Sequence, residues 1–218
     1  MIQGAIFDVD GTLLDSMIIW QTVGEQYLRA QGIVPRENLA ETFKTMSLQD
    51  AAAHFIICYH VPLSLDEIMD GINAMVEDFY RHKAQPKPGV AVFLQELERR
   101  NIPMCIATAT DRYLVEAALE RCNLLHYFRD IFTCTQVGSS KTSPEIYRQA
   151  AACLGFRKEN VWVFEDAIHA ACTAGADSFP VAGIYDPAEE NQQALQDCCQ
   201  VYLKSFEDTC KFWKFASL

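Results

Sequence analysis

The sequence lacks several features that would direct a protein to a membrane or to a nucleic acid. None of its apolar runs approaches the length needed to span a bilayer, and it contains no internal repeat, low-complexity tract or run of basic residues. The formal net charge of -11 would repel both nucleic acids and anionic lipids. We therefore expect neither a nucleic acid nor a membrane as a partner.

The chain also lacks the signs of secretion and of a thiol-bound metal. Its start has neither a basic stretch nor a small-residue cleavage site, so we expect a cytoplasmic protein. The nine cysteines are odd in number and mostly lie in apolar segments, which favours buried free thiols over disulfides. Neither the irregular spacing of Cys198, Cys199 and Cys210 nor the scattered histidines suit a metal site.

Short apolar runs alternate with helical patterns over most of the 218 residues. Such alternation predicts an α/β fold with a doubly wound, Rossmann-like parallel sheet. The expected strands cover residues 4–9, 104–107, 131–134, 161–164, 181–184 and 201–203, and the expected helices between them cover residues 90–100, 113–122 and 145–154.

The region 17–83 differs, because its apolar residues recur at three- and four-residue spacing throughout. Helices are expected at 18–31, 39–43, 48–59 and 65–81, with Ser47 and Ser64 as helix starts. A stiff connector rich in proline follows at 85–90. We therefore expect residues 1–16 and 84–218 to form the α/β core domain and residues 17–83 to form an inserted α-helical cap domain.

Two carboxylates, Asp8 and Asp10, lie at the carboxyl end of the first expected strand, after the apolar run at residues 4–7. Ligands of open α/β sheets bind at the carboxyl ends of the strands, and Gly11 would let the chain turn so that both aspartates face one crevice. Two acids at that edge suggest metal and phosphate chemistry. The alternative is structural, because Asp-Gly is a common turn pair and an aspartate after a strand is often a helix cap.

Residues 8–16, DVDGTLLDS, resemble the first motif of the haloacid dehalogenase-like phosphotransferases. Within that superfamily the chain is most similar to the β-phosphoglucomutase-like and phosphatase branch, which carries a helical cap after this motif. The resemblance implies that Asp8 is the nucleophile and that Asp10 is the general acid and base.

Three further motifs of the family can be matched in order. Thr108, with its neighbour Ala109, ends the second buried strand, and the resemblance implies that it binds a phosphoryl oxygen. Lys141, shortly before a helix that starts at Pro144, would balance the charge of the nucleophile and the phosphate. The structural alternatives are a strand-end cap for the threonine and a solvated surface lysine.

Glu165 and Asp166 form the fourth motif, after the strand at 161–164. The resemblance implies a Mg²⁺ site in which Asp8 and Asp166 supply carboxylate oxygens, Asp10 supplies its backbone carbonyl and Glu165 contributes a further oxygen. Magnesium is typically held by one or two carboxylates together with water and the substrate phosphate.

These matches imply a Mg²⁺-dependent phosphomonoester hydrolase, working as a monomer on a small phosphorylated metabolite such as a sugar phosphate, through an aspartyl-phosphate. The alternative is a sugar-phosphate mutase of the β-phosphoglucomutase type. The cap segment 43–48 only partly matches the mutase pattern, with Lys44 where an arginine is expected. Since lysine cannot grip a second phosphate bidentately, hydrolysis is favoured, and Lys44 is a candidate substrate-binding residue.

Two other classes of protein are alternatives. A haloacid dehalogenase would use Asp8 but would need neither Asp10 nor Asp166. A non-catalytic binding protein on the same fold stays open, because fold alone does not establish function.

Overall fold

The structure is a computed structural model that describes residues 1–37, 39, 46 and 48–216. The chain divides into two compact units. One contains Met1–Asp15 and Ala84–Leu218, and the other contains Ser16–Lys83.

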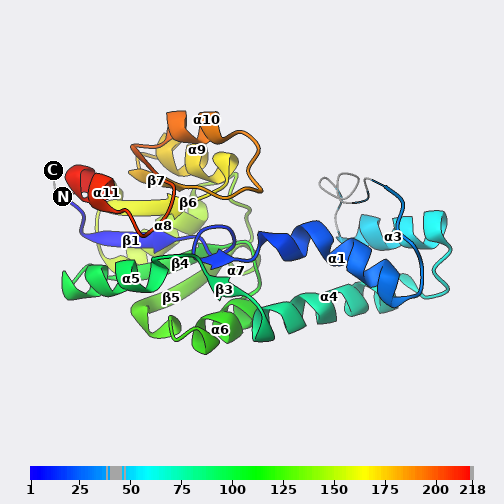
Figure 1. Cartoon of the computed structure of the whole chain (residues 1–218). Helices are drawn as coiled ribbons and strands as arrows, with labels where there is room; N and C mark the ends of the chain where they lie inside the picture. The colour runs from blue at the N-terminus through cyan, green and yellow to red at the C-terminus, as the bar shows by residue number, and fades with distance from the viewer. Residues whose placement is uncertain (38, 40–45, 47, 217–218) are drawn as a thin grey trace. The chain divides into compact units, whose positions relative to one another are not determined.

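A six-stranded sheet forms the centre of the first unit (Figure 1). Its order is β5-β4-β1-β6-β7-β8, and every neighbouring pair is parallel. The strands are β1 Gly4–Phe7, β4 Met104–Thr108, β5 Phe128–Thr133, β6 Val161–Glu165, β7 Val181–Ile184 and β8 Val201–Leu203. The predicted doubly wound α/β fold is confirmed.

Helices cover both faces of this sheet. The expected helices at 90–100, 113–122 and 145–154 are present within one residue, and two further helices that were not among those expected follow β6 and β7. The helices of this unit are α5 Val90–Arg99, α6 Arg112–Arg121, α7 Cys134–Val137, α8 Glu145–Leu154, α9 Ile168–Ala176, α10 Gln192–Cys198 and α11 Cys210–Ala216, with 3₁₀ turns η1 Leu125–Tyr127 and η2 Lys158–Asn160.

Alternate side chains of β1 enter two different cores, because successive residues of a strand point to opposite faces. Ile6 belongs to a buried cluster with Ile146 of α8 and Val163 of β6. Phe7 stacks on Phe164 at 4.3 Å between ring centroids, in an aromatic cluster that reaches α5 and α11. Burial on both faces explains why β1, β4, β6 and β7 are nearly continuous apolar runs.

The strand order reverses at β1. The chain adds β4 and then β5 on one side of β1, and it then crosses over to add β6, β7 and β8 on the other side. The carboxyl ends of β4, β1 and β6 therefore border the point where open α/β sheets bind their ligands.

A second, two-stranded sheet pairs β2 Leu14–Asp15 with β3 Gln85–Pro86 in antiparallel register. The expectation of a plain connector at residues 85–90 is wrong for its first two residues. Two-residue strands carry no sequence periodicity, and this pairing joins segments about seventy residues apart in the chain, so no local pattern could reveal it.

The second unit contains the helices α1 Met17–Ala30, α3 Leu48–Tyr59 and α4 Leu65–His82. The predicted start at Ser64 is confirmed by a capping box, in which Ser64 accepts from the backbone N–H of Glu67 while the Glu67 carboxylate accepts from that of Ser64. A Cβ at Gly71 of α4 would lie 2.6 Å from the Tyr27 ring of α1. Any larger residue at this position would therefore force the ring to move. The expected start at Ser47 and most of the expected helix at 39–43 lie outside the described residues.

All nine cysteines are free, but the expectation that they are buried is wrong for most of them. Cys105 is buried, whereas Cys153, Cys172 and Cys210 are exposed, because they fall on the outward faces of helices. Among the described residues, no helix combines the length and the apolar character needed to cross a bilayer.

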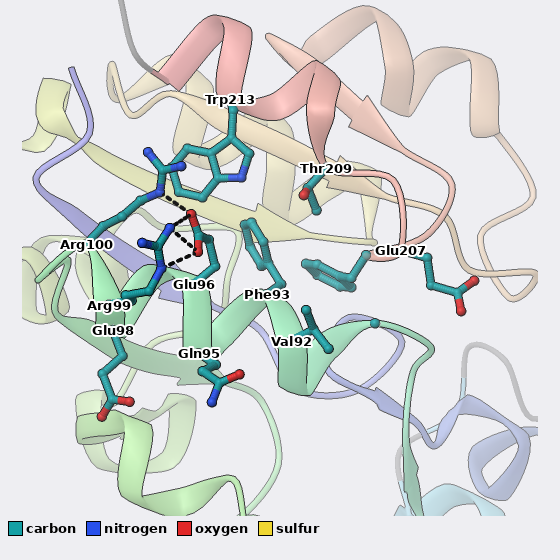
Figure 2. A pocket seen from close by; sticks show the side chains of 12 residues that line it. Val92, Phe93, Gln95, Glu96, Glu98, Arg99, Arg100, Glu207, Thr209 and Trp213 are labelled. Atoms are coloured by element: carbon teal, nitrogen blue, oxygen red, sulfur yellow. Dashed lines mark hydrogen bonds and ion pairs between the residues drawn. The ribbon is translucent and has the colours of Figure 1, made fainter.

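A hollow of about 1070 Å³ lies between α5 and the segment from Phe206 to Trp213 (Figure 2). Its two basic side chains, Arg99 and Arg100, are both paired with Glu96, at 2.8 and 2.6 Å. Because both guanidinium groups already have a carboxylate partner and the acidic residues of the sequence motifs do not line it, this hollow is not the candidate active site.

Candidate active site

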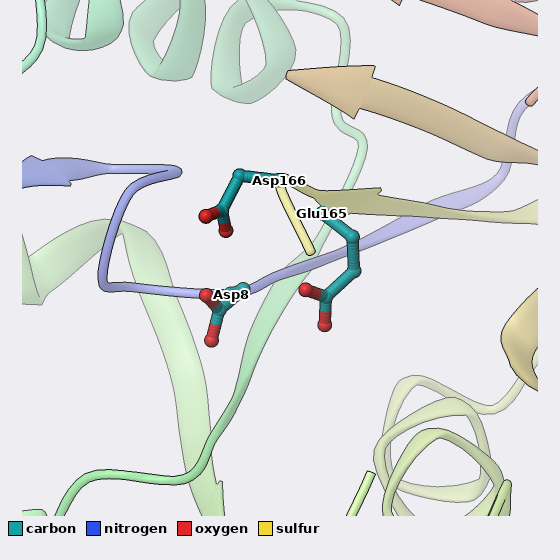
Figure 3. A group of neighbouring side chains, drawn as sticks. All are labelled: Asp8, Glu165 and Asp166. Atoms are coloured by element: carbon teal, nitrogen blue, oxygen red, sulfur yellow. The ribbon is translucent and has the colours of Figure 1, made fainter. Parts of the chain in front are cut away.

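Three buried carboxylates converge where β1 and β6 end (Figure 3). Asp8 directly follows β1, Glu165 is the last residue of β6, and Asp166 comes next. The two strands are neighbours, so their ends are held side by side. One carboxylate oxygen from each residue lies within 4.8 Å of the others.

Lys141 provides the positive charge of this cluster. Its Nζ donates to Asp8 Oδ1 at 2.5 Å and to Glu165 Oε1 at 2.6 Å, and its side chain is only 7% exposed. Burial alone would lower the pKa of Lys141, but the charges of Asp8 and Glu165 outweigh burial and raise that pKa. The lysine is therefore charged at neutral pH, and it is not a solvated surface residue.

Glu165 is held from two sides. Its Oε1 accepts from Lys141 and also, at 2.7 Å, from the hydroxyl of Tyr147, a buried residue of α8. Burial raises the pKa of Glu165 to about 7, against the opposing effect of Lys141. Its second oxygen, Oε2, is buried and has no partner among the described residues.

Asp166 is anchored by Thr12, whose hydroxyl donates to Asp166 Oδ1 at 2.9 Å. Burial and the charges of Asp8 and Glu165 raise the pKa of Asp166 above its ordinary value. The buried, closely spaced carboxylates thus disfavour the charged form of Asp166.

Asp10 lies two residues after Asp8, directly before the turn at residues 11–13. The hydroxyl of Thr110 donates to Asp10 Oδ2 at 2.7 Å, so the loop after β4 orients this carboxylate. Thr108 ends β4 and is fully buried, and its Oγ1 accepts from the backbone N–H of Thr110 at 3.1 Å. The next residue, Ala109, is exposed at the strand end.

The structure thus brings Asp8, Lys141, Glu165 and Asp166 into direct contact or close proximity, and it links Asp10 to the loop of Thr108. The predicted phosphate contacts of Thr108 and Ala109 stay predictions. Lys44 lies outside the described residues.

Sequence reasoning missed three polar partners of these residues: Thr12, Thr110 and Tyr147. The two threonines stand inside or beside the motifs, so hydroxyls close to each acid were an available signal. Tyr147 offered none, because a tyrosine in an amphipathic helix is normally read as core packing.

A family model described as haloacid dehalogenase-like hydrolase matches residues 5–183. The chain belongs to this family. The resemblance carried by residues 8–16 is thereby confirmed, and the protein is a hydrolase of the haloacid dehalogenase-like family.

Two curated relatives of this hydrolase cover most of its length. Protein CbbY of Cereibacter sphaeroides is 29% identical over 87% of this chain and 88% of its own. The fructose-1-phosphate phosphatase YqaB of Escherichia coli is 28% identical over 82% of this chain and 95% of its own.

A solved structure from Thermotoga maritima, assigned as a β-phosphoglucomutase, superposes with a TM-score of 0.86. The match covers 98% of this chain and 99% of that chain at 22% identity. At that identity the likeness establishes the shared fold only.

The acidic cluster of this hydrolase suits a metal ion. Asp8, Glu165 and Asp166 bring three carboxylates together against one ammonium, which leaves an excess of negative charge in a buried site. The unpartnered Oε2 of Glu165 offers a free acceptor there. Hard divalent cations such as Mg²⁺ prefer oxygen ligands of this kind.

Proposed function

We propose that this hydrolase is a Mg²⁺-dependent phosphatase that cleaves a small phosphorylated metabolite, such as a sugar phosphate, through an aspartyl-phosphate on Asp8. The observation that carries the proposal is the ammonium of Lys141, which bridges Asp8 and Glu165 at the switch point of the sheet. A buried cation against a carboxylate at that edge is the arrangement that an anionic substrate needs.

The first step uses Asp8 and Asp10. An oxygen of Asp8 attacks the phosphorus while the bond from phosphorus to the leaving oxygen breaks, and protonated Asp10 gives its proton to that oxygen. The products are the free alcohol and a phosphoryl group bound to Asp8. The hydroxyl of Thr110, bonded to Asp10 Oδ2, orients the acid toward the leaving group.

The second step reverses the role of Asp10. Its carboxylate takes a proton from water, the water oxygen attacks phosphorus, and the bond to Asp8 breaks to release inorganic phosphate. Lys141 stays within reach of the Asp8 carboxylate throughout, and its positive charge offsets the charge that gathers on the phosphoryl oxygens.

Asp8, Glu165 and Asp166, with the backbone carbonyl of Asp10, would hold the Mg²⁺ ion. When bound, the ion screens the charge of the carboxylates and of the phosphoryl group, which otherwise repel each other. Thr108 and Ala109 would bind a phosphoryl oxygen from the end of β4.

The relatives support this substrate class, since one of them is named a phosphatase of fructose 1-phosphate. We infer a compact sugar phosphate or similar metabolite rather than a polymer. The second unit, Ser16–Lys83, would act as the cap that selects it, with Lys44 as a candidate contact.

A substrate panel tests this proposal. Phosphate release is measured from sugar phosphates, phosphoglycolate and nucleotides in the presence of Mg²⁺ and, separately, of EDTA. Asp8→Asn is run beside the wild type, and Asp197→Asn serves as a matched control, because Asp197 is an exposed aspartate on α10 that bonds only Gln193 in the described interactions.

We expect Mg²⁺-dependent release by the wild type and by Asp197→Asn, and no release by Asp8→Asn. A coupled assay for conversion of β-glucose 1-phosphate to glucose 6-phosphate runs in parallel. Isomerisation without release would make the protein a mutase, and silence in both assays would favour the non-catalytic alternative.

A further inference from the structure

A second lysine, Lys87, directly follows β3, and its side chain is only 13% exposed. Its hydrogen bonds and ion pair go to groups outside the acidic cluster. Its Nζ donates to the backbone carbonyl of Gly11 at 2.5 Å, to that of Tyr185 at 2.6 Å and to Asp186 Oδ2 at 2.8 Å. An ammonium has three protons, so these acceptors occupy all of them. Lys87 is therefore not available to bind a substrate phosphate.

Its partner Asp186 is fixed independently of the lysine. Asp186 is 1% exposed, and its Oδ1 accepts from the backbone N–H of Ala188 at 2.9 Å. Its backbone carbonyl also accepts from the side-chain amide of Gln192 at 2.6 Å. The loop after β7 thus holds the Asp186 carboxylate in place, and the Lys87 ammonium forms an ion pair with it.

Lys87 grips the turn after Asp10 twice. Its backbone N–H donates to the carbonyl of Leu13 at 2.9 Å, while its side chain holds the carbonyl of Gly11. Gly11 has a φ of +77°, which few other residues adopt, and its own N–H closes the turn onto Leu14 at 3.0 Å. Lys87 therefore holds two carbonyl groups of one tight turn, those of Gly11 and Leu13.

Gly11, whose carbonyl accepts from Lys87, lies between two residues of the site. Asp10 precedes it, with its carboxylate held by Thr110, and Thr12 follows it, with its hydroxyl on Asp166. A shift of the Gly11 backbone would therefore move both Asp10 and the Thr12 hydroxyl that is bonded to Asp166.

A buried ion pair is an inefficient way to add stability, since an apolar pair of similar volume often serves as well. We propose that Lys87, seated on Asp186, is a positioning residue that holds Asp10 where it can give its proton to the leaving group. This inference rests on the proposed function, because it assigns Lys87 a part in the same phosphoryl transfer.

The test exploits the leaving group. The leaving group of a sugar phosphate is an alkoxide, which needs the proton of Asp10. The leaving group of p-nitrophenyl phosphate is a stable phenolate, which needs that proton little. Lys87→Met is compared with the wild type on both substrates. Lys158→Met is the matched control, because Lys158 is also an ion-paired lysine of this unit, bonded to Asp177 at 2.9 Å.

We expect Lys87→Met to lower kcat for the sugar phosphate by roughly 10- to 100-fold, with KM changed by less than about threefold, since small misplacements of a catalytic group have effects of this size. The loss on p-nitrophenyl phosphate should be several-fold smaller, and Lys158→Met should resemble the wild type. An equal loss on both substrates, or no loss on either, would overturn the inference.

Asp186→Asn provides a second variant if Lys87→Met does not fold, because it leaves the lysine its two carbonyl acceptors. It should show a smaller loss with the same dependence on the leaving group, and a loss that ignores the leaving group would count against the inference. A wild type that is inactive on both substrates would instead overturn the proposed function, and this inference with it.

Discussion

Replacing Lys141 by methionine removes the one ammonium among three buried carboxylates while keeping a side chain of similar length. Taking away one partner of a buried ion pair typically costs about 3–5 kcal/mol, because the remaining charge is left uncompensated. At about 1.36 kcal/mol for each factor of ten, a loss of that size carried into the transition state lowers kcat/KM by roughly 10²- to 10⁴-fold. We therefore expect Lys141→Met to be almost inactive on any substrate of the wild type.

The same change should alter how stability depends on pH. A carboxyl group whose pKa is raised in the folded state contributes stability that is present at low pH and lost as the pH rises through the raised value. Burial raises the pKa of Glu165 to about 7, and without Lys141 that pKa should rise further. Without Mg²⁺, the free energy of unfolding of Lys141→Met should thus be closer to that of the wild type at about pH 5 than at about pH 8.

Steady-state phosphate release and urea unfolding measure the two effects, with Lys158→Met as the control in both. An activity of Lys141→Met within threefold of the wild type would refute the assigned charge balance. A stability deficit that does not change with pH would contradict the electrostatic account of the cluster.

Other predictions follow from hydrogen bonds and thiols around the sheet. Thr110→Val should lower kcat roughly tenfold with little change in KM, because the hydroxyl that orients Asp10 is lost, and an unchanged kcat would refute this. Asp177→Asn should lower the free energy of unfolding by about 1 kcal/mol at neutral pH, after allowance for solvent screening. Hydrogen bonds from an arginine and a lysine hold the pKa of Asp177 at about 2, so that stability is present above its ordinary pKa and is lost as the pH falls through about 2; urea melts in which the deficit stays constant through this window would contradict it. Hydrogen peroxide should convert the thiols of Cys172 and Cys198, whose sulfurs lie 2.7 Å apart, into a disulfide with release of water, and thiol titration should then show the loss of this pair in the wild type but not in Cys172→Ser. The crosslink should raise stability by about 3 kcal/mol, and oxidised protein that melts like the reduced form would refute this.

The sequence predicts the centre of the sheet well because β1, β4, β6 and β7 are buried on both faces. Apolar runs at 181–184 and 201–203 coincide with β7 and β8, and the helical pattern at 145–154 coincides with α8. Such runs follow from local composition alone, so no tertiary information is needed to find them. The shortest strands, β2 and β3, exist only through their pairing and could not be found in this way.

The candidate site was predictable to the extent that its residues stand at strand ends. Asp8, Glu165 and Asp166 follow runs that the sequence marks as strands, and adjacent parallel strands bring their ends together. The partners that hold them come from elsewhere. Tyr147 reaches Glu165 from a helix, and Lys87 pairs with a residue 99 positions away. Contacts between side chains so far apart in the chain are set by packing and leave no local pattern.

In the proposed mechanism, Asp8 carries the phosphoryl group between the two steps. We would quench the enzyme in acid during turnover of its best substrate and measure the mass of the intact protein. We expect a fraction of the protein to be heavier by one phosphoryl group, with the addition on the peptide that contains Asp8 and absent from Asp8→Asn. Rapid phosphate release with no adduct on that peptide at any quench time, or an adduct that persists in Asp8→Asn, would contradict it.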